Sequence, residues 1–97
     1  MSWTVILEDE HGNAIEKLKN EFDFEGDVIN DENYKILKYL DPYGDTTFNT
    51  NMLSDLIADL TRLKLNSENN LVQIDEIIQL ATLCNREPHT YLKFYGD

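Results

Sequence analysis

The sequence predicts an α+β fold: a mainly antiparallel sheet of about four to five strands with two amphipathic helices packed on one face. Two observations lead to this prediction. Segments rich in β-branched and aromatic residues lie near both ends of the chain, and residues 52–85 carry apolar residues at intervals of three and four. The chain has 97 residues, 41% of them hydrophobic, which suits a single domain, residues 1–97, around one core.

The chain is expected to begin with a strand. Residues 3–7, Trp-Thr-Val-Ile-Leu, combine aromatic and β-branched side chains, which favour extended backbone. Residues 9–13 then predict a turn, because Gly12 and Asn13 tolerate positive φ angles. A second strand that pairs back on the first would suit this turn.

The segment that follows, residues 14–24, admits two interpretations. Ile15, Leu18 and Phe22 recur at helical spacing, which favours a helix. Phe22 and Phe24 instead alternate as the residues of a strand do. The sequence leaves both interpretations open.

The middle of the chain predicts a loop followed by a β-hairpin. Residues 23–33 are acidic and polar, which is typical of a loop. Residues 35–40 are apolar enough for a strand, and residues 41–45 contain a proline and a glycine placed as in a tight turn. Because residues 46–48 resume as a strand, residues 35–48 are expected to form a hairpin.

A first amphipathic helix is expected after this hairpin. Its apolar stripe consists of Met52, Leu53, Leu56, Ile57, Leu60 and Leu63. Asp55, Asp59 and Arg62 are expected on the opposite, solvent-facing side. Asn49 or Asn51 is a candidate cap, since an asparagine side chain can accept a hydrogen bond from a free N–H at a helix start.

A second helix is expected over residues 69–85, with a strand after it. Its apolar stripe consists of Leu71, Ile74, Ile77, Ile78, Ala81 and Cys84. Ser67 is a candidate cap at its start, and Pro88 prevents its continuation. Residues 90–95 alternate aromatic, aliphatic and charged side chains, which predicts a final strand.

The cysteine content and the chain start indicate a cytoplasmic protein. Cys84 is the single cysteine, so no intramolecular disulfide can form, and its place on an apolar stripe favours a core role over a nucleophile. The first residues lack the basic region and apolar run of a signal peptide. No apolar stretch approaches the ~20 residues of a membrane span. We therefore expect a soluble protein with no membrane partner.

The sequence offers little support for catalysis or metal binding. His11 and His89 form no HxxxH or HxH pair, and no glycine-rich phosphate loop is present. Asp41 and Asp45 could bind a cation or act as an acid/base pair, but aspartates in turns more often accept backbone hydrogen bonds. Catalysis would require Asp41, Asp45 and His89 to converge on one cleft. We expect no enzyme activity, cofactor or metal.

The charge is the feature most informative about function. The net charge is −11, and positions 8–32 hold ten acidic residues against two lysines. Such a surface repels nucleic acid and speeds the encounter with basic partners, although a solvated, solubilising surface is the alternative. The candidate partner-binding residues are acidic side chains of this region and two interleaved phenylalanines: Glu21, Asp23, Glu25, Asp27, Asp31, Glu32, Phe22 and Phe24.

Residues 37–49 and 89–97, together with the opening residues 3–10, carry a resemblance. They resemble a group of short bacterial proteins that share a strand–"DPYGDTxFN"–helix core and a "HxYLxFxGD" ending. The size and acidity are similar to those of immunity proteins of bacterial toxin systems, such as contact-dependent growth inhibition. These are cytosolic and neutralise a cognate toxin domain, often a basic nuclease, by direct binding.

The resemblance implies a basic toxin domain as the partner. It assigns no interface residues, because immunity interfaces differ between toxin pairs. The alternative is a non-enzymatic regulatory or adaptor domain, as a monomer or as a homodimer joined through the terminal strand or an exposed sheet edge. The sequence leaves the toxin's activity and the oligomeric state open.

Overall fold

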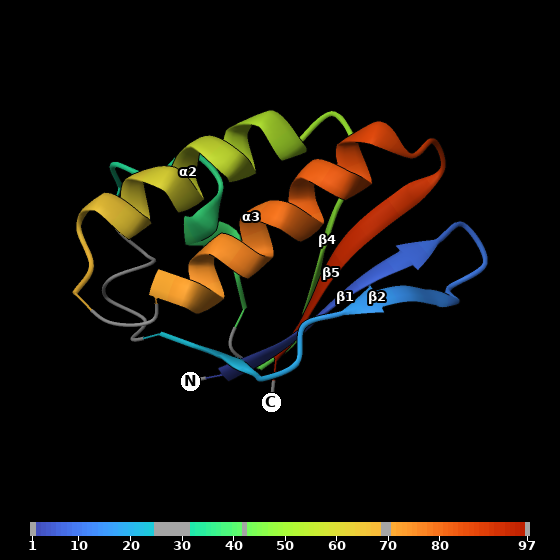
Figure 1. Cartoon of the computed structure of the whole chain (residues 1–97), viewed down its shortest axis with the longest axis horizontal. Helices are drawn as coiled ribbons and strands as arrows, with labels where there is room; N and C mark the ends of the chain where they lie inside the picture. Colours follow the sequence, from blue (N-terminus) through green and yellow to red (C-terminus); the bar gives the residue numbers. More distant parts are fainter. Residues whose placement is uncertain (1, 25–31, 42, 69–70, 97) are drawn as a thin grey trace.

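The structure is a computed structural model that describes residues 2–24, 32–41, 43–68 and 71–96. Over these residues the protein has two layers: a sheet, and two helices that lie side by side on one of its faces (Figure 1). This arrangement confirms the predicted α+β fold class. In the described part of the chain, neither helix has both the length and the apolar character needed to cross a membrane.

All strand pairings in the sheet are antiparallel. The strands are β1 (Ser2–Asp9), β2 (Ala14–Lys17), β3 (Phe22–Asp23), β4 (Asp45–Phe48) and β5 (Thr90–Gly96). Their order is β2-β1-β5-β4, and β3 also pairs with β1. The predicted first and last strands are confirmed, and they are neighbours in the sheet. Strand β5 pairs with β1 along its length and with β4 over residues 92–95, and the homodimer alternative stays a prediction.

The two open interpretations of residues 14–24 resolve in favour of strands, β2 and β3. The turn before them is confirmed, with Gly12 at a φ of 82°. After β2 the N–H of Leu18 donates to the carbonyl of Val5, at 3.0 Å. Leu18 and Phe22 are both buried. Leu18 and Phe22 therefore both reach the core. They are four residues apart, as in a helix, although the backbone of this segment runs alongside β1.

The predicted hairpin over residues 35–48 is wrong in its first half. Leu37–Tyr39 forms a short 3₁₀ helix, η1, and β4 pairs with β5. Only the turn and the second strand of the hairpin are as predicted. Leu37 and Leu40 are buried, so the apolar character that suggested a strand belongs to a segment that packs against the helix layer.

The side chain of Asp59 explains why this segment does not pair as a strand. Its carboxylate accepts hydrogen bonds from the backbone N–H groups of Lys35, Ile36 and Leu37, at 2.7 to 3.1 Å. In a strand, these three N–H groups would need the carbonyl groups of a neighbouring strand as acceptors. Here the carboxylate of Asp59 takes that place. Asp59 is 4% exposed, so its predicted place on the solvent-facing side of the first helix is wrong.

Both predicted helices are confirmed, as α2 (Leu53–Leu65) and α3 (Leu71–Arg86). The predicted asparagine cap of the first helix does not form, and the start of the second helix borders residues that lie outside the described part of the chain. The side chain of Asn49 accepts the N–H of Asn51, and α2 begins after Met52 without a side-chain cap. The hydroxyl of Ser67 donates back to the carbonyl of Leu63 in α2. Helix α3 ends two residues before the proline, as predicted.

The core lies between the helices and the face of the sheet that they cover. Its largest side chains are aromatic: Trp3, Phe22, Phe48 and Phe94. The rings of Phe48 and Phe94 meet edge to face with centroids 5.4 Å apart. Cys84 is buried, which confirms its predicted place in the core, and this burial raises the pKa of its thiol.

Candidate functional site on the outer face of the sheet

The face of the sheet opposite the helices is the outer face. Side chains alternate between the two faces of a strand, and the register therefore identifies the residues that share this face. They are Ser2, Thr4, Ile6, Glu8, Ala14, Lys17, Asp23, Asp45, Thr47, Tyr91, Lys93 and Tyr95. In the described part of the chain, both helices lie on the other side (Figure 1).

Strand β5 carries the centre line of the outer face. Tyr95 lies between Thr4 of β1 and Asp45 of β4. Lys93 has Ile6 and Thr47 as its neighbours, and Tyr91 lies beside Glu8. The face therefore presents two tyrosines on either side of a lysine, at the middle of the sheet. The alternation of residues 90–95 is visible in the sequence and predicts a strand, but it does not show which face of that strand stays uncovered.

A polar network holds the side chains at the centre of this face. The Tyr95 hydroxyl donates a hydrogen bond to Oε2 of Glu8, and Nζ of Lys93 lies 3.4 Å from Oε1. The same lysine lies over the Tyr95 ring, 5.7 Å from its centroid. The Glu8 side chain is 6% exposed, although it lies on the face that the helices leave open.

The network shifts two pKa values. The negative charge of Glu8 raises the pKa of Lys93, and the hydrogen bond to Glu8 raises the pKa of the Tyr95 hydroxyl. At neutral pH the lysine is therefore charged and the tyrosine is protonated. Both oxygens of Glu8 have a partner, which makes the group a rigid part of the surface.

A shallow depression of about 260 Å³ opens at one end of the outer face. It is lined by Glu8, Asp9, Glu10, Gly12, Thr47, Tyr91 and Lys93. Three carboxylates therefore surround it with a single amine and one aromatic ring. The depression lies beside the β1–β2 turn. The outer face therefore borders the start of the acidic region, residues 8–32.

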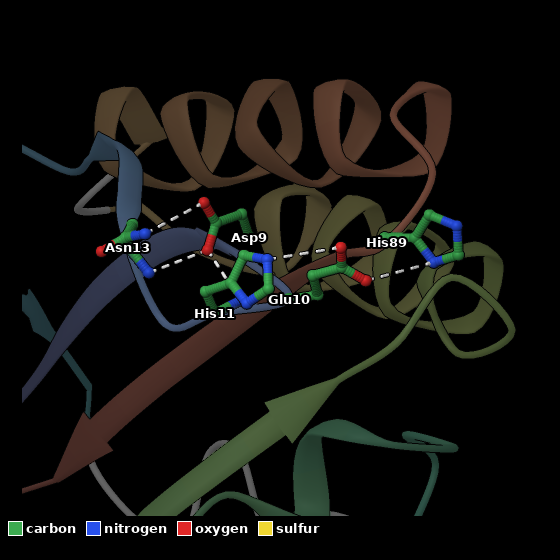
Figure 2. A network of polar contacts seen from close by, with 5 residues as sticks. All are labelled: Asp9, Glu10, His11, Asn13 and His89. Atoms are coloured by element: carbon green, nitrogen blue, oxygen red, sulfur yellow. Dashed lines mark hydrogen bonds and ion pairs between the residues drawn. The ribbon is translucent and has the colours of Figure 1, made fainter.

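Asp9 holds the backbone of the β1–β2 turn. Its Oδ1 accepts the N–H groups of His11 and Asn13, both at 2.9 Å, as Figure 2 shows. The bond from Asn13 is the main cause of the lowered pKa of the Asp9 carboxyl. Because these bonds occupy Asp9, the exposed carboxylate of Glu10 is the group that projects from the turn.

Both histidines of the chain lie against Glu10 (Figure 2). Nε2 of His11 is 3.6 Å from one oxygen and Nδ1 of His89 is 3.8 Å from the other. His89 is the residue before β5 and has a positive φ of 59°. Within the described residues, no group of three or more histidine, cysteine or acidic side chains could hold a metal ion.

The three residues considered for a catalytic group, Asp41, Asp45 and His89, do not converge. The side chain of Asp41 accepts the N–H of Tyr43 at 2.9 Å, which confirms its predicted structural role in the turn. Asp45 pairs with Tyr95, whereas His89 precedes the first residue of β5, so they lie about 20 Å apart along the strand. Asp41, Asp45 and His89 therefore share no cleft.

The predicted partner-binding residues fall into three groups. Glu21, Asp23 and Glu32 are exposed. Glu25, Asp27 and Asp31 lie outside the described residues.

The third group is the two phenylalanines, and the structure corrects the prediction for Phe22. Phe22 is 0% exposed and packs against Trp3 and Phe94, so it cannot serve as an anchor for a partner. Phe24 is half-buried, with its ring 4.9 Å from that of Phe22. Their alternation with acidic residues reflects the two faces of a strand: the apolar side chain turns to the core and the acidic ones to solvent.

A second hollow, of about 340 Å³, lies between β2 and α3. Its lining is Glu16, Lys17, Leu18, Lys19, Glu76, Gln79, Leu80 and Leu83. The charged residues of this rim are two acidic and two basic, so the hollow has no dominant sign of charge. The depression at the end of the outer face, which three carboxylates and one amine line, has the more distinctive charge.

Comparison with known proteins yields no relative: no family model, no curated protein and no solved structure matches this chain. The resemblance to immunity proteins therefore stays a prediction.

Proposed function

We propose that this protein is a cytoplasmic immunity protein that binds a basic toxin domain, such as a nuclease, and neutralises it by occlusion. The observation that carries the proposal is the concentration of negative charge in residues 8–32. Five acidic residues of this region that the structure describes are exposed: Glu10, Glu16, Glu21, Asp23 and Glu32.

The acidic surface supports this function through its effect on association. A nuclease that binds a polyanion must present a basic surface, and an acidic protein competes for that surface directly. Opposite charges steer the two proteins together and raise the association rate, an effect that salt screens. The fold suits binding by this acidic surface. The β1–β2 turn is attached through β1 to a sheet that packs against two helices.

The test is co-expression of the protein with the toxin domain encoded next to it. We expect the two to co-purify, cells to be protected, and the association rate to fall steeply as salt rises. Reversal of two charges in the acidic region, Glu21→Lys with Glu25→Lys, should slow association about tenfold or more at low salt. The matched control is Glu68→Lys with Glu87→Lys, which changes the net charge equally outside this region.

Two results together would contradict the proposal. A neighbouring gene that encodes no toxic domain, together with no protection of cells by this protein, would rule out the immunity function. A regulatory or adaptor role would then be the better explanation.

A further inference from the structure

We infer that the end of the outer face around Tyr91, and not the acidic segment 21–32 that begins at its other end, is the surface on which the basic partner docks, with an arginine side chain of the partner in the depression beside Tyr91. This inference rests on the proposed function, because it names the contact surface and the chemistry of that partner.

The composition of the outer face is the first argument. An exposed sheet face whose only purpose is to be solvated carries polar residues along every strand. This face instead presents Tyr91 and Tyr95 on its centre line and Ile6 beside them. Tyrosine combines a large apolar surface with a polar end, and it is enriched where proteins meet.

The rigidity of the face is the second argument. β1 and β5 pair from Trp3 opposite Gly96 to Asp9 opposite Thr90, so the two strands that carry the face are held along their whole length. Glu8, Lys93 and Tyr95 are fixed to one another. A surface that is already ordered loses little conformational entropy on binding.

Charge complementarity identifies the occupant. Lys93 neutralises Glu8, and the turn amides occupy Asp9. The exposed carboxylate of Glu10 lies at the rim of the depression, and its histidine neighbours, His11 and His89, are at 3.6 and 3.8 Å, beyond hydrogen-bond distance. A guanidinium group can bind a carboxylate through two parallel hydrogen bonds and stack on an aromatic ring. Tyr91 and Glu10 both line the depression and offer these two partners.

The same charges argue against other occupants. Nucleic acid can stack on an aromatic sheet face, but the carboxylates of Glu10 and Asp45 would repel its phosphates. A second copy of this chain, docked face to face by twofold symmetry, would bring the same acidic residues together. A basic protein meets neither obstacle.

The first experiment maps the contact directly. Amide chemical shifts of the isotope-labelled protein are followed as a hexa-arginine peptide is added, with a hexa-lysine peptide as the comparison. We expect the largest shifts at Tyr91, Lys93 and Thr47, and weaker binding of the lysine peptide. Shifts confined to residues 21–32, or equal responses to both peptides, would overturn the inference.

The second experiment uses the co-expressed toxin domain. Tyr91→Ala and Glu10→Lys should each weaken the complex about tenfold or more, because residues at the centre of an interface dominate its affinity. Tyr39→Ala and Glu68→Lys, which alter an exposed tyrosine and an exposed glutamate elsewhere, should change it less than about twofold. Thermal unfolding of each variant identifies any loss of fold. A further variant, Tyr91→Leu, keeps the bulk of the side chain without the aromatic ring and should also weaken binding.

The outcomes separate the two proposals. If the toxin binds normally to the Tyr91 and Glu10 variants but not to the Glu21/Glu25 double variant, the docking surface is wrong and the immunity function stands. If the toxin does not bind the unaltered protein, the immunity function itself fails.

Discussion

The two faces of the central strands differ sharply although they are built from alternate residues of the same segments. On the inner face, Val5, Leu92 and Phe94 are completely buried under the helices. On the outer face, Ile6, Lys93 and Tyr95 are their immediate neighbours in sequence and remain partly exposed. Adjacent positions therefore serve different purposes: one residue holds the sheet to the helices, and the next forms a surface.

The largest effect is expected on the inner face, at Phe94. Its ring packs against those of Phe48 and Phe22, so Phe94→Ala should leave a cavity and lower the free energy of unfolding by about 3–5 kcal/mol. Urea denaturation followed by circular dichroism measures this loss. The matched change on the other face of the same strand, Tyr91→Ala, should cost less than about 1.5 kcal/mol. Equal losses would show that the two faces contribute alike to stability.

A smaller effect is expected at Asp59, the polar group buried in the helix layer. Asp59→Ala leaves three backbone N–H groups without their acceptor, and it should lower the free energy of unfolding by about 2–3 kcal/mol. Asp59→Asn keeps one acceptor oxygen and should cost less. Amide hydrogen exchange at residues 35–37 should accelerate in the alanine variant before the sheet is affected. Unchanged exchange there would mean that η1 does not depend on this carboxylate.

The smallest effect concerns the polar network of the outer face and appears only at high pH. The folded-state pKa values of Tyr95 and Lys93 are raised above their ordinary 10.0 and 10.5, so the network's contribution to stability is present below pH 10 and is lost as the pH rises through the folded values. Ultraviolet titration should show one tyrosine that ionises later than the others. Glu8→Gln should remove this delay, and Tyr91→Phe should leave it in place.

The candidate site illustrates what the sequence can and cannot reveal about function. The acidic region was predictable, because charge is counted directly from the residues. The burial of Phe22 was not, since the sequence left residues 14–24 open between a helix and a strand, and only the strand assigns alternate residues to opposite faces. The outer face was missed for a related reason. Alternation along β5 separates its residues into two sets, but only the position of the helices shows which set stays uncovered.

The sequence by itself determined both helices, the first and last strands and the turn after β1, because each depends on a short-range pattern of apolar residues or turn formers. The tertiary structure decided the rest. It placed β5 between β1 and β4, and it made η1 out of a segment with the composition of a strand. The physical reason lies in backbone hydrogen bonding: the donors of residues 35–37 are satisfied by Asp59, more than twenty residues away, and no local pattern shows such a distant acceptor.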